Sequence, residues 1–169
     1  MASVWYDVPL VVQGANPICW IACMAMIAAE REGHSPVIEK YNNGFNPNNS
    51  SDANPASNMD DFTRRLARCG FSSGSLDTTA DAIASFLTDN GPLILTHNCA
   101  GFPYGSGWAP KTSGVHAVVI TGIDTDTPTC WMNNPWGNKD REVPVSAVLQ
   151  AVFQYQSIGA NIAYYQSSV

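Results

Sequence analysis

The first half of the chain carries apolar residues in helical patterns. Residues 19–32 read CWIACMAMIAAERE, a run that is mostly apolar, lacks Pro and Gly, and ends in charged residues. This pattern predicts a buried helix, with Asn16 as its cap and Pro17 in its first turn. Two more helices are predicted over 59–69 and 79–89, where apolar side chains recur at helical spacing and a Gly follows.

After Pro92 the pattern changes to short runs that are rich in β-branched residues. Such runs are typical of buried strands. Strands are predicted at 93–97, 116–123, 129–133, 141–145 and 161–166, with an extended segment at 3–12 and a short helix at 146–151. Helices followed by strands predict an α+β fold, in which an N-terminal helical part packs on a C-terminal antiparallel β-sheet. No repeat or linker divides the chain, so residues 1–169 are expected to form one domain.

Two polar segments separate these elements and are predicted to be surface loops. Residues 42–58 are rich in Asn, Ser and Pro, and residues 99–113 are rich in Gly. Loops of such length within a compact domain are frequently functional. We expect both to contribute side chains to a substrate pocket.

The composition restricts the classes of partner. The chain has 169 residues, of which 45% are hydrophobic and only 13% charged, and its net charge is −6. It has no basic cluster, so neither nucleic acid nor an anionic membrane is an expected partner. No run reaches the roughly 18 apolar residues of a membrane span. The first Lys or Arg is Arg31, so no signal peptide is predicted. We expect a protein that is cytoplasmic as synthesised or exported by a specialised secretion system.

The cysteine pattern argues against metal and redox sites. The chain has five cysteines and no C-x-x-C pair, which weakens the case for a zinc ribbon or a thioredoxin-like motif. Neither a metal nor another cofactor is expected. Buried thiols are the default interpretation for most of the five, which are Cys19, Cys23, Cys69, Cys99 and Cys130.

Cys19 is the candidate nucleophile because of the residues that accompany it. A thiol at a helix N-terminus and beside an imidazolium has a lowered pKa and becomes a strong nucleophile. His116 begins a predicted strand and would act as general acid and base. Asn134, or the adjoining Asn133, would accept a hydrogen bond from the second ring nitrogen and orient the imidazole.

Further side chains are predicted to complete this site. Gln13 lies six residues before Cys19, and its side-chain NH₂ and the backbone N–H of Cys19 form a candidate oxyanion hole. Trp108 and Trp136 are candidates for binding substrate, since one lies in the Gly-rich segment before His116 and the other directly follows Asn-Asn-Pro. Three of these residues also have other interpretations: Cys19 as a core thiol, Gln13 as a turn residue, and Trp136 either as packed over the Asn134–His116 pair, where it would exclude water, or as plain core.

Taken in order, Gln13, Cys19-Trp20, His116 and Asn134 resemble the papain-like cysteine peptidase superfamily. The likeness is closer to its compact bacterial branch, which includes bacteriocin-leader peptidases and secreted effector proteases. It is carried by VPLVVQGANPICWIACMAMI, GVHAVVITGID and NNPWG. The resemblance implies a papain-like fold, with the nucleophile helix on the antiparallel sheet. It also implies a peptidase that acts through a Cys19 acyl-enzyme on a protein or peptide substrate.

The sequence departs from the family pattern in several places. The compact branch often has Asp where this chain has Asn134, and larger relatives have Cys-Gly where it has Asn16-Pro17-Ile18. The middle of the chain, residues 32–90, cannot be matched. His116 also lies closer to Cys19 in the sequence than the corresponding residues do in the larger relatives. Neither this spacing nor the change at Asn16-Pro17-Ile18 removes a catalytic group.

Other functions use the same kind of site. The main alternative is a peptidoglycan amidase or endopeptidase, which the acidic composition without a wall-binding module disfavours. A second alternative is a catalytically silent papain-like binding domain, which would be expected to lack the Cys or the His. An acyltransferase is also compatible with Cys-His chemistry. One further hypothesis is a bacterial effector or toxin, held by a cognate inhibitor or immunity protein before it is delivered.

Overall fold

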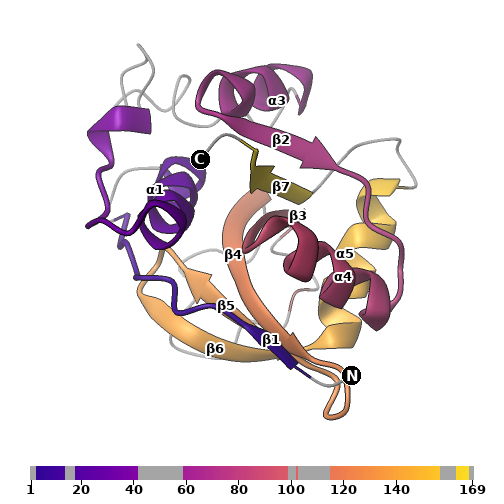
Figure 1. The fold of residues 1–169 in the computed structure, drawn as a ribbon. Helices are drawn as coiled ribbons and strands as arrows, with labels where there is room; N and C mark the ends of the chain where they lie inside the picture. The colour runs from indigo at the N-terminus through magenta and orange to yellow at the C-terminus, as the bar shows by residue number, and fades with distance from the viewer. Residues whose placement is uncertain are drawn as a thin grey trace.

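The computed structural model of the chain describes residues 3–13, 18–41, 59–98, 102, 115–156 and 163–167, and Figure 1 shows its elements. The helices are α1 (Cys19–Glu32), the 3-10 helix η1 (Glu39–Tyr41), α3 (Met59–Arg68), α4 (Ala80–Asn90) and α5 (Val145–Gln156). The strands are β1 (Ser3–Trp5), β2 (Phe71–Gly74), β3 (Leu93–Asn98), β4 (Val115–Asp124), β5 (Thr129–Asn134), β6 (Asn138–Pro144) and β7 (Ala163–Gln166).

The described strands form one antiparallel sheet around the long strand β4. Six strands follow the order β2-β7-β3-β4-β5-β6, and β1 pairs with β4 outside this path. The partners of β4 divide its length, since β3 pairs with Val115–Ile120 and β1 pairs with Gly122–Asp124. The predicted α+β fold with an antiparallel sheet is confirmed.

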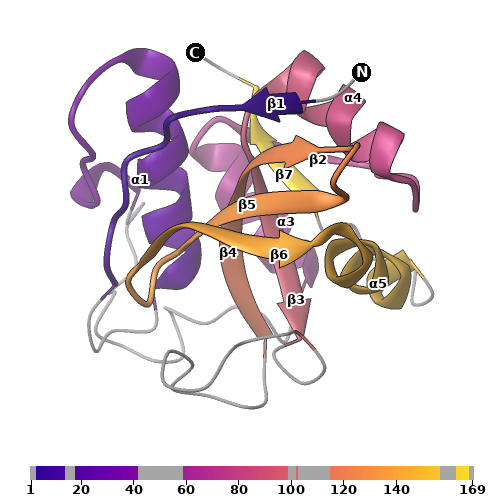
Figure 2. The ribbon, with the colours of Figure 1, turned by 90° about the horizontal axis from the view of Figure 1, so that it is seen from below.

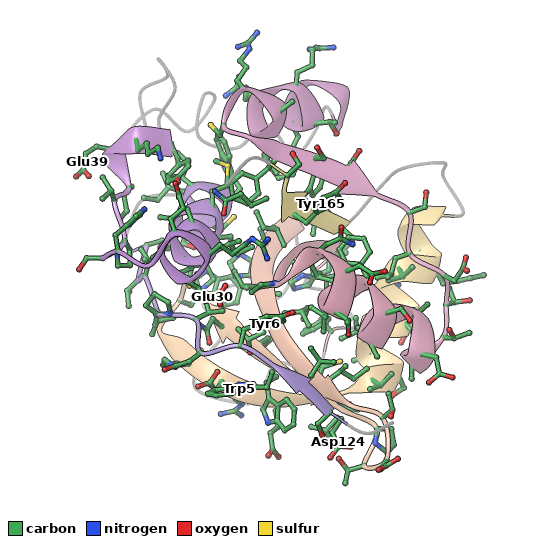
Figure 3. All side chains as sticks on the ribbon, viewed as in Figure 1. Trp5, Tyr6, Glu30, Glu39, Asp124 and Tyr165 are labelled. Carbon is green, nitrogen blue, oxygen red and sulfur yellow. The ribbon has the colours of Figure 1, made fainter. Side chains whose placement is uncertain are left out.

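Alternation along β4 divides the core into two layers, because successive side chains of a strand point to opposite faces. Ala117 and Val119 belong to the apolar cluster around α1. Val118 and Ile120 belong to the cluster that α4 and α5 cover. Figures 1 and 2 show α1 on one face of the sheet and α4 and α5 on the other.

Helix α1 is buried along nearly its whole length, as its apolar sequence requires. Every side chain from Trp20 to Ala29 is buried. The helix ends at Gly33, whose φ of 73° suits glycine and whose N–H donates to the carbonyl of Ala29 at 3.0 Å. Its N-cap is Ile18, which makes no side-chain hydrogen bond, so the prediction that Asn16 caps the helix is wrong.

Several other boundaries differ from the sequence-based expectations. Strand β2 was not expected, because its sequence FSSG is short and polar; it forms at the sheet edge, where β7 supplies its hydrogen bonds. Helix α5 continues to Gln156, well past the predicted end at residue 151. Elements are also interleaved, since β2 lies between two helices and α5 follows β6.

The predicted loop 42–58 lies outside the described residues, as does the 99–113 segment except for Phe102. No helix in the described part of the chain is long and apolar enough to cross a membrane.

Candidate active site

His116 is the second residue of β4, and its side chain is buried. Its Nε2 lies 2.9 Å from Oδ1 of Asn134, the last residue of β5. An amide oxygen only accepts hydrogen bonds, so the Nε2–H of His116 is the donor. The neutral ring then carries its proton on Nε2, and Nδ1 is the nitrogen that can take up and release a proton.

The pairing of Asn134 with His116 distinguishes it from the adjacent Asn133. Neighbouring residues of a strand face opposite sides of the sheet, so only one of the two can reach the histidine. Asn133 instead donates from Nδ2 to the carbonyl of Val8 at 2.8 Å and accepts from the N–H of Asp140 at 2.9 Å. Asn133 therefore ties the chain near β1 to the β5–β6 hairpin.

The turn that follows Asn134 encloses the imidazole. Oδ1 of Asn134 also accepts from the N–H of Trp136 at 3.0 Å. The carbonyl of Asn134 accepts from the N–H of Gly137 at 2.9 Å. The φ of Gly137 is 123°, a conformation that favours glycine. The Trp136 ring is stacked on the His116 ring, with centroids 3.9 Å apart and planes 12° apart. Trp136 thus lies against the imidazole, as one of its sequence-based interpretations expected.

Gln13 belongs to the segment that enters α1, and this segment is bound to the same turn. The backbone N–H of Gln13 donates to the carbonyl of Pro135 at 2.8 Å. The side chain of Gln13 is half-buried. The candidate oxyanion-hole residue and the turn that holds the histidine are therefore joined through the backbone.

Cys19 is the first residue of α1 and is half-buried. The N-cap residue Ile18 makes no side-chain hydrogen bond, and the positive end of the helix dipole lies at this thiol. In Figure 2, α1 and β4 both begin at the lower edge of the molecule, where β3 ends. Helix α1 packs on both strands.

The other described cysteines lack the properties of a nucleophile. Cys23, one helical turn after Cys19, is fully buried, and burial together with the charge of Cys19 raises its pKa well above the usual range. Burial raises the pKa of Cys69 and raises the pKa of Cys130 to about 12. Among the described residues, no group of three His, Cys, Asp or Glu side chains could hold a metal ion.

One buried residue at this site, His97, is not among the candidates from the sequence. It lies directly opposite His116 in the antiparallel pair β3–β4, and the two rings are 5.8 Å apart. The sequence did contain a signal for it. One predicted strand ends with His97 and the next begins with His116, so an antiparallel pairing of the two strands would bring both histidines to one edge of the sheet. Trp108 lies outside the described residues.

Comparisons with known proteins give a family and a fold. The model of the Peptidase C70 family, described as papain-like cysteine protease AvrRpt2, matches residues 2–152. A solved protein described as a C39-like peptidase from Bacillus anthracis has a TM-score of 0.61 at 16% identity, covering 98% of this chain and 97% of that chain. A comparison with curated proteins gives no match.

Two further solved structures share the fold. A double glycine motif protease from an AMS/PCAT transporter, in complex with the leader peptide, has a TM-score of 0.50 at 15% identity, covering 98% of this chain and 96% of that chain. Digestive procathepsin L 3 of Tenebrio molitor larval midgut has a TM-score of 0.53 at 12% identity, covering 99% of this chain and 70% of that chain. Identities at this level indicate a shared fold and no more.

Proposed function

The chain belongs to the papain-like cysteine protease family, and we propose that it cleaves peptide bonds through an acyl-enzyme on Cys19. The observation that carries this assignment is the 2.9 Å hydrogen bond from His116 Nε2 to Asn134 Oδ1. It holds one ring nitrogen and leaves Nδ1 as the proton-exchanging atom, as a general acid and base requires. The helix terminus at Cys19 favours a thiolate.

In the proposed reaction, the thiolate of Cys19 attacks the carbonyl carbon of the peptide bond. The C–N bond then breaks, and Nδ1 of His116 gives its proton to the leaving amine. Water next attacks the thioester, and Nδ1 of His116 takes one proton from this water. The C–S bond then breaks, which releases the carboxylic acid and leaves the thiolate and the imidazolium as they were at the start. The Gln13 side chain and the backbone N–H of Cys19 would stabilise the oxyanion in both steps.

A peptide is the substrate class that best fits this site. Support comes from the family and from the fold-related double glycine motif protease, which was solved with a leader peptide. A silent binding domain is disfavoured because Cys19, His116 and Asn134 are all present. Delivery as an effector or toxin, and control by a cognate inhibitor, are further hypotheses from the sequence.

Digestion of a peptide library by the full chain tests the proposal. We expect peptide-bond cleavage by the wild type and by Cys69→Ala, a control that removes a half-buried thiol elsewhere. Cys19→Ala and His116→Ala should be inactive, and Gln13→Ala should lose about 10²–10³ in kcat.

Turnover by Cys19→Ala would refute the assignment of the nucleophile. The same variants are also incubated with muropeptides. Hydrolysis of muropeptides without cleavage of library peptides would favour the alternative function, a peptidoglycan amidase or endopeptidase.

A further inference from the structure

A second histidine, His97, lies beside the proposed acid and base. It faces His116 across β3 and β4, with ring centroids 5.8 Å apart and ring planes at 74°. Its side chain is fully buried. A histidine at such a position needs a physical reason, because an apolar residue would fill the same space without burying a polar ring.

His97 is part of a continuous row of four rings. Phe102 packs on His97 at a centroid distance of 4.3 Å, with planes 35° apart. His97 contacts His116 edge to face, and His116 is stacked on Trp136 at 3.9 Å. We call these four residues the ring row. Through it, the ring of His116 is held from β3 as well as from the turn after β5.

We propose that His97 is a positioning residue of the peptidase, which keeps the His116 ring in the orientation that Asn134 and Trp136 also impose. This inference rests on the proposed function, because it concerns the same imidazole. The hydrogen bond to Asn134 fixes one ring atom, and a single bond still permits the ring to tilt about it. A second ring contact restricts that tilt and hence the direction of Nδ1.

The environment of His97 suits a ring that packs without taking a charge. Burial and the charge of His116 together lower the pKa of His97 to about 3, although a backbone hydrogen bond with Leu95 opposes this shift. Strand β7 pairs with β3 on the side away from β4 and contains Tyr164. Burial raises the pKa of Tyr164, so its hydroxyl group stays neutral. In the proposed mechanism, His116 is the histidine that carries the positive charge beside the thiolate.

Removing the ring at residue 97 tests this role. Displacements of about 1 Å at a reacting group can cost up to about 10²-fold in rate. We expect His97→Leu to lower kcat about 10-fold with little change in KM. We also expect the pH midpoint of iodoacetamide alkylation at Cys19 to rise, because a tilted imidazolium stabilises the thiolate less. His97→Phe keeps an aromatic ring and should remain close to wild type in both measurements.

The controls separate positioning from general damage to the core. Leu93→Val removes volume on the same strand, within the apolar cluster that also contains Phe102, and it should lower stability without moving the alkylation midpoint. If His97→Leu does not fold, His97→Met, which also lacks a ring, takes its place.

Two outcomes would overturn the proposal. One is a folded Leu or Met variant with wild-type kcat and alkylation midpoint. The other is a Phe variant as impaired as the Leu variant, because the nitrogens rather than the ring would then matter. Failure of the proposed function would differ from both, since Cys19→Ala or His116→Ala would then retain activity.

Discussion

Asn134 connects the two parts of the site, and replacing it gives a prediction of defined size. Its Oδ1 accepts from Nε2 of His116 at 2.9 Å and from the N–H of Trp136 at 3.0 Å. Asn134→Ala leaves both donors without this acceptor. A hydrogen bond to a charged group contributes about 1.5–3 kcal/mol, so we expect kcat/KM to fall about 10- to 100-fold.

Asn134→Asp provides the matched comparison. A carboxylate keeps both acceptor contacts and removes Nδ2, which is buried without a hydrogen-bond partner among the described residues. A negative charge next to His116 favours the imidazolium, so deprotonation of the ring requires a higher pH. The basic limb of the kcat/KM profile should therefore move to higher pH, with the maximal rate retained within about 10-fold.

The assay is hydrolysis of one peptide from the library digest, followed between about pH 5 and 10. Thermal unfolding of each variant shows whether it is folded at the assay temperature. Asn133→Ala is the control, because Asn133 binds backbone groups of Val8 and Asp140 and should affect stability rather than the pH profile. A folded Asn134→Ala variant with wild-type kcat/KM would refute the reasoning, as would a basic limb that moves to lower pH in Asn134→Asp.

Three further changes test separate parts of the account. Trp136→Leu removes the ring stacked on His116 and should lower kcat about 2- to 30-fold, as expected for a cation–π contact of about 0.5–2 kcal/mol, whereas Trp136→Phe should lose less in the same initial-rate assay. Gly122→Ala places a Cβ 2.5 Å from the carbonyl oxygen of Val4 and should cost about 1–3 kcal/mol in urea unfolding; unchanged stability would contradict the close approach of β1 to β4. Because the pKa of His97 is about 3 in the folded protein against 6.5 for an unperturbed histidine, the unfolded chain binds the extra proton between these values. Wild-type stability should therefore fall by as much as ~5 kcal/mol as the pH drops from 6.5 to 3, and His97→Phe should show a shallower decline in unfolding experiments at pH 4 and 7.

Elements with a strong hydrophobic pattern were predictable from the sequence. The run 19–32 gave the bounds of α1, and the β-branched run after His116 gave the strand at the centre of the sheet. Strand β2 was missed because its pairing depends on β7, which lies about 90 residues further along the chain. The cap of α1 was misplaced because Asn16 has a strong intrinsic preference for caps, whereas the packed core fixes the helix start at Cys19.

The order of the site residues and a histidine–asparagine hydrogen bond could be predicted, but the remaining contacts of the site could not. The sequence left Asn133 and Asn134 as alternatives, and strand alternation separates them only once the register with β4 is known. Trp136 had several interpretations from the sequence, among them a substrate contact and packing over the Asn134–His116 pair, and the structure shows its ring stacked on the histidine. His97 lies opposite His116 because of the register between β3 and β4, and the sequence of either strand alone does not determine this register.

The most direct test of the central claim is to map the site of covalent labelling by an epoxide thiol inhibitor on the full chain. Mass spectrometry of the digested adduct identifies the labelled cysteine. Cys23, Cys69 and Cys130 serve as internal controls, since burial raises the pKa of each. The account predicts one adduct, on Cys19, whose formation stops peptide cleavage and is absent in Cys19→Ala. An inactivating adduct on another cysteine, or equal labelling of Cys19→Ala, would contradict it.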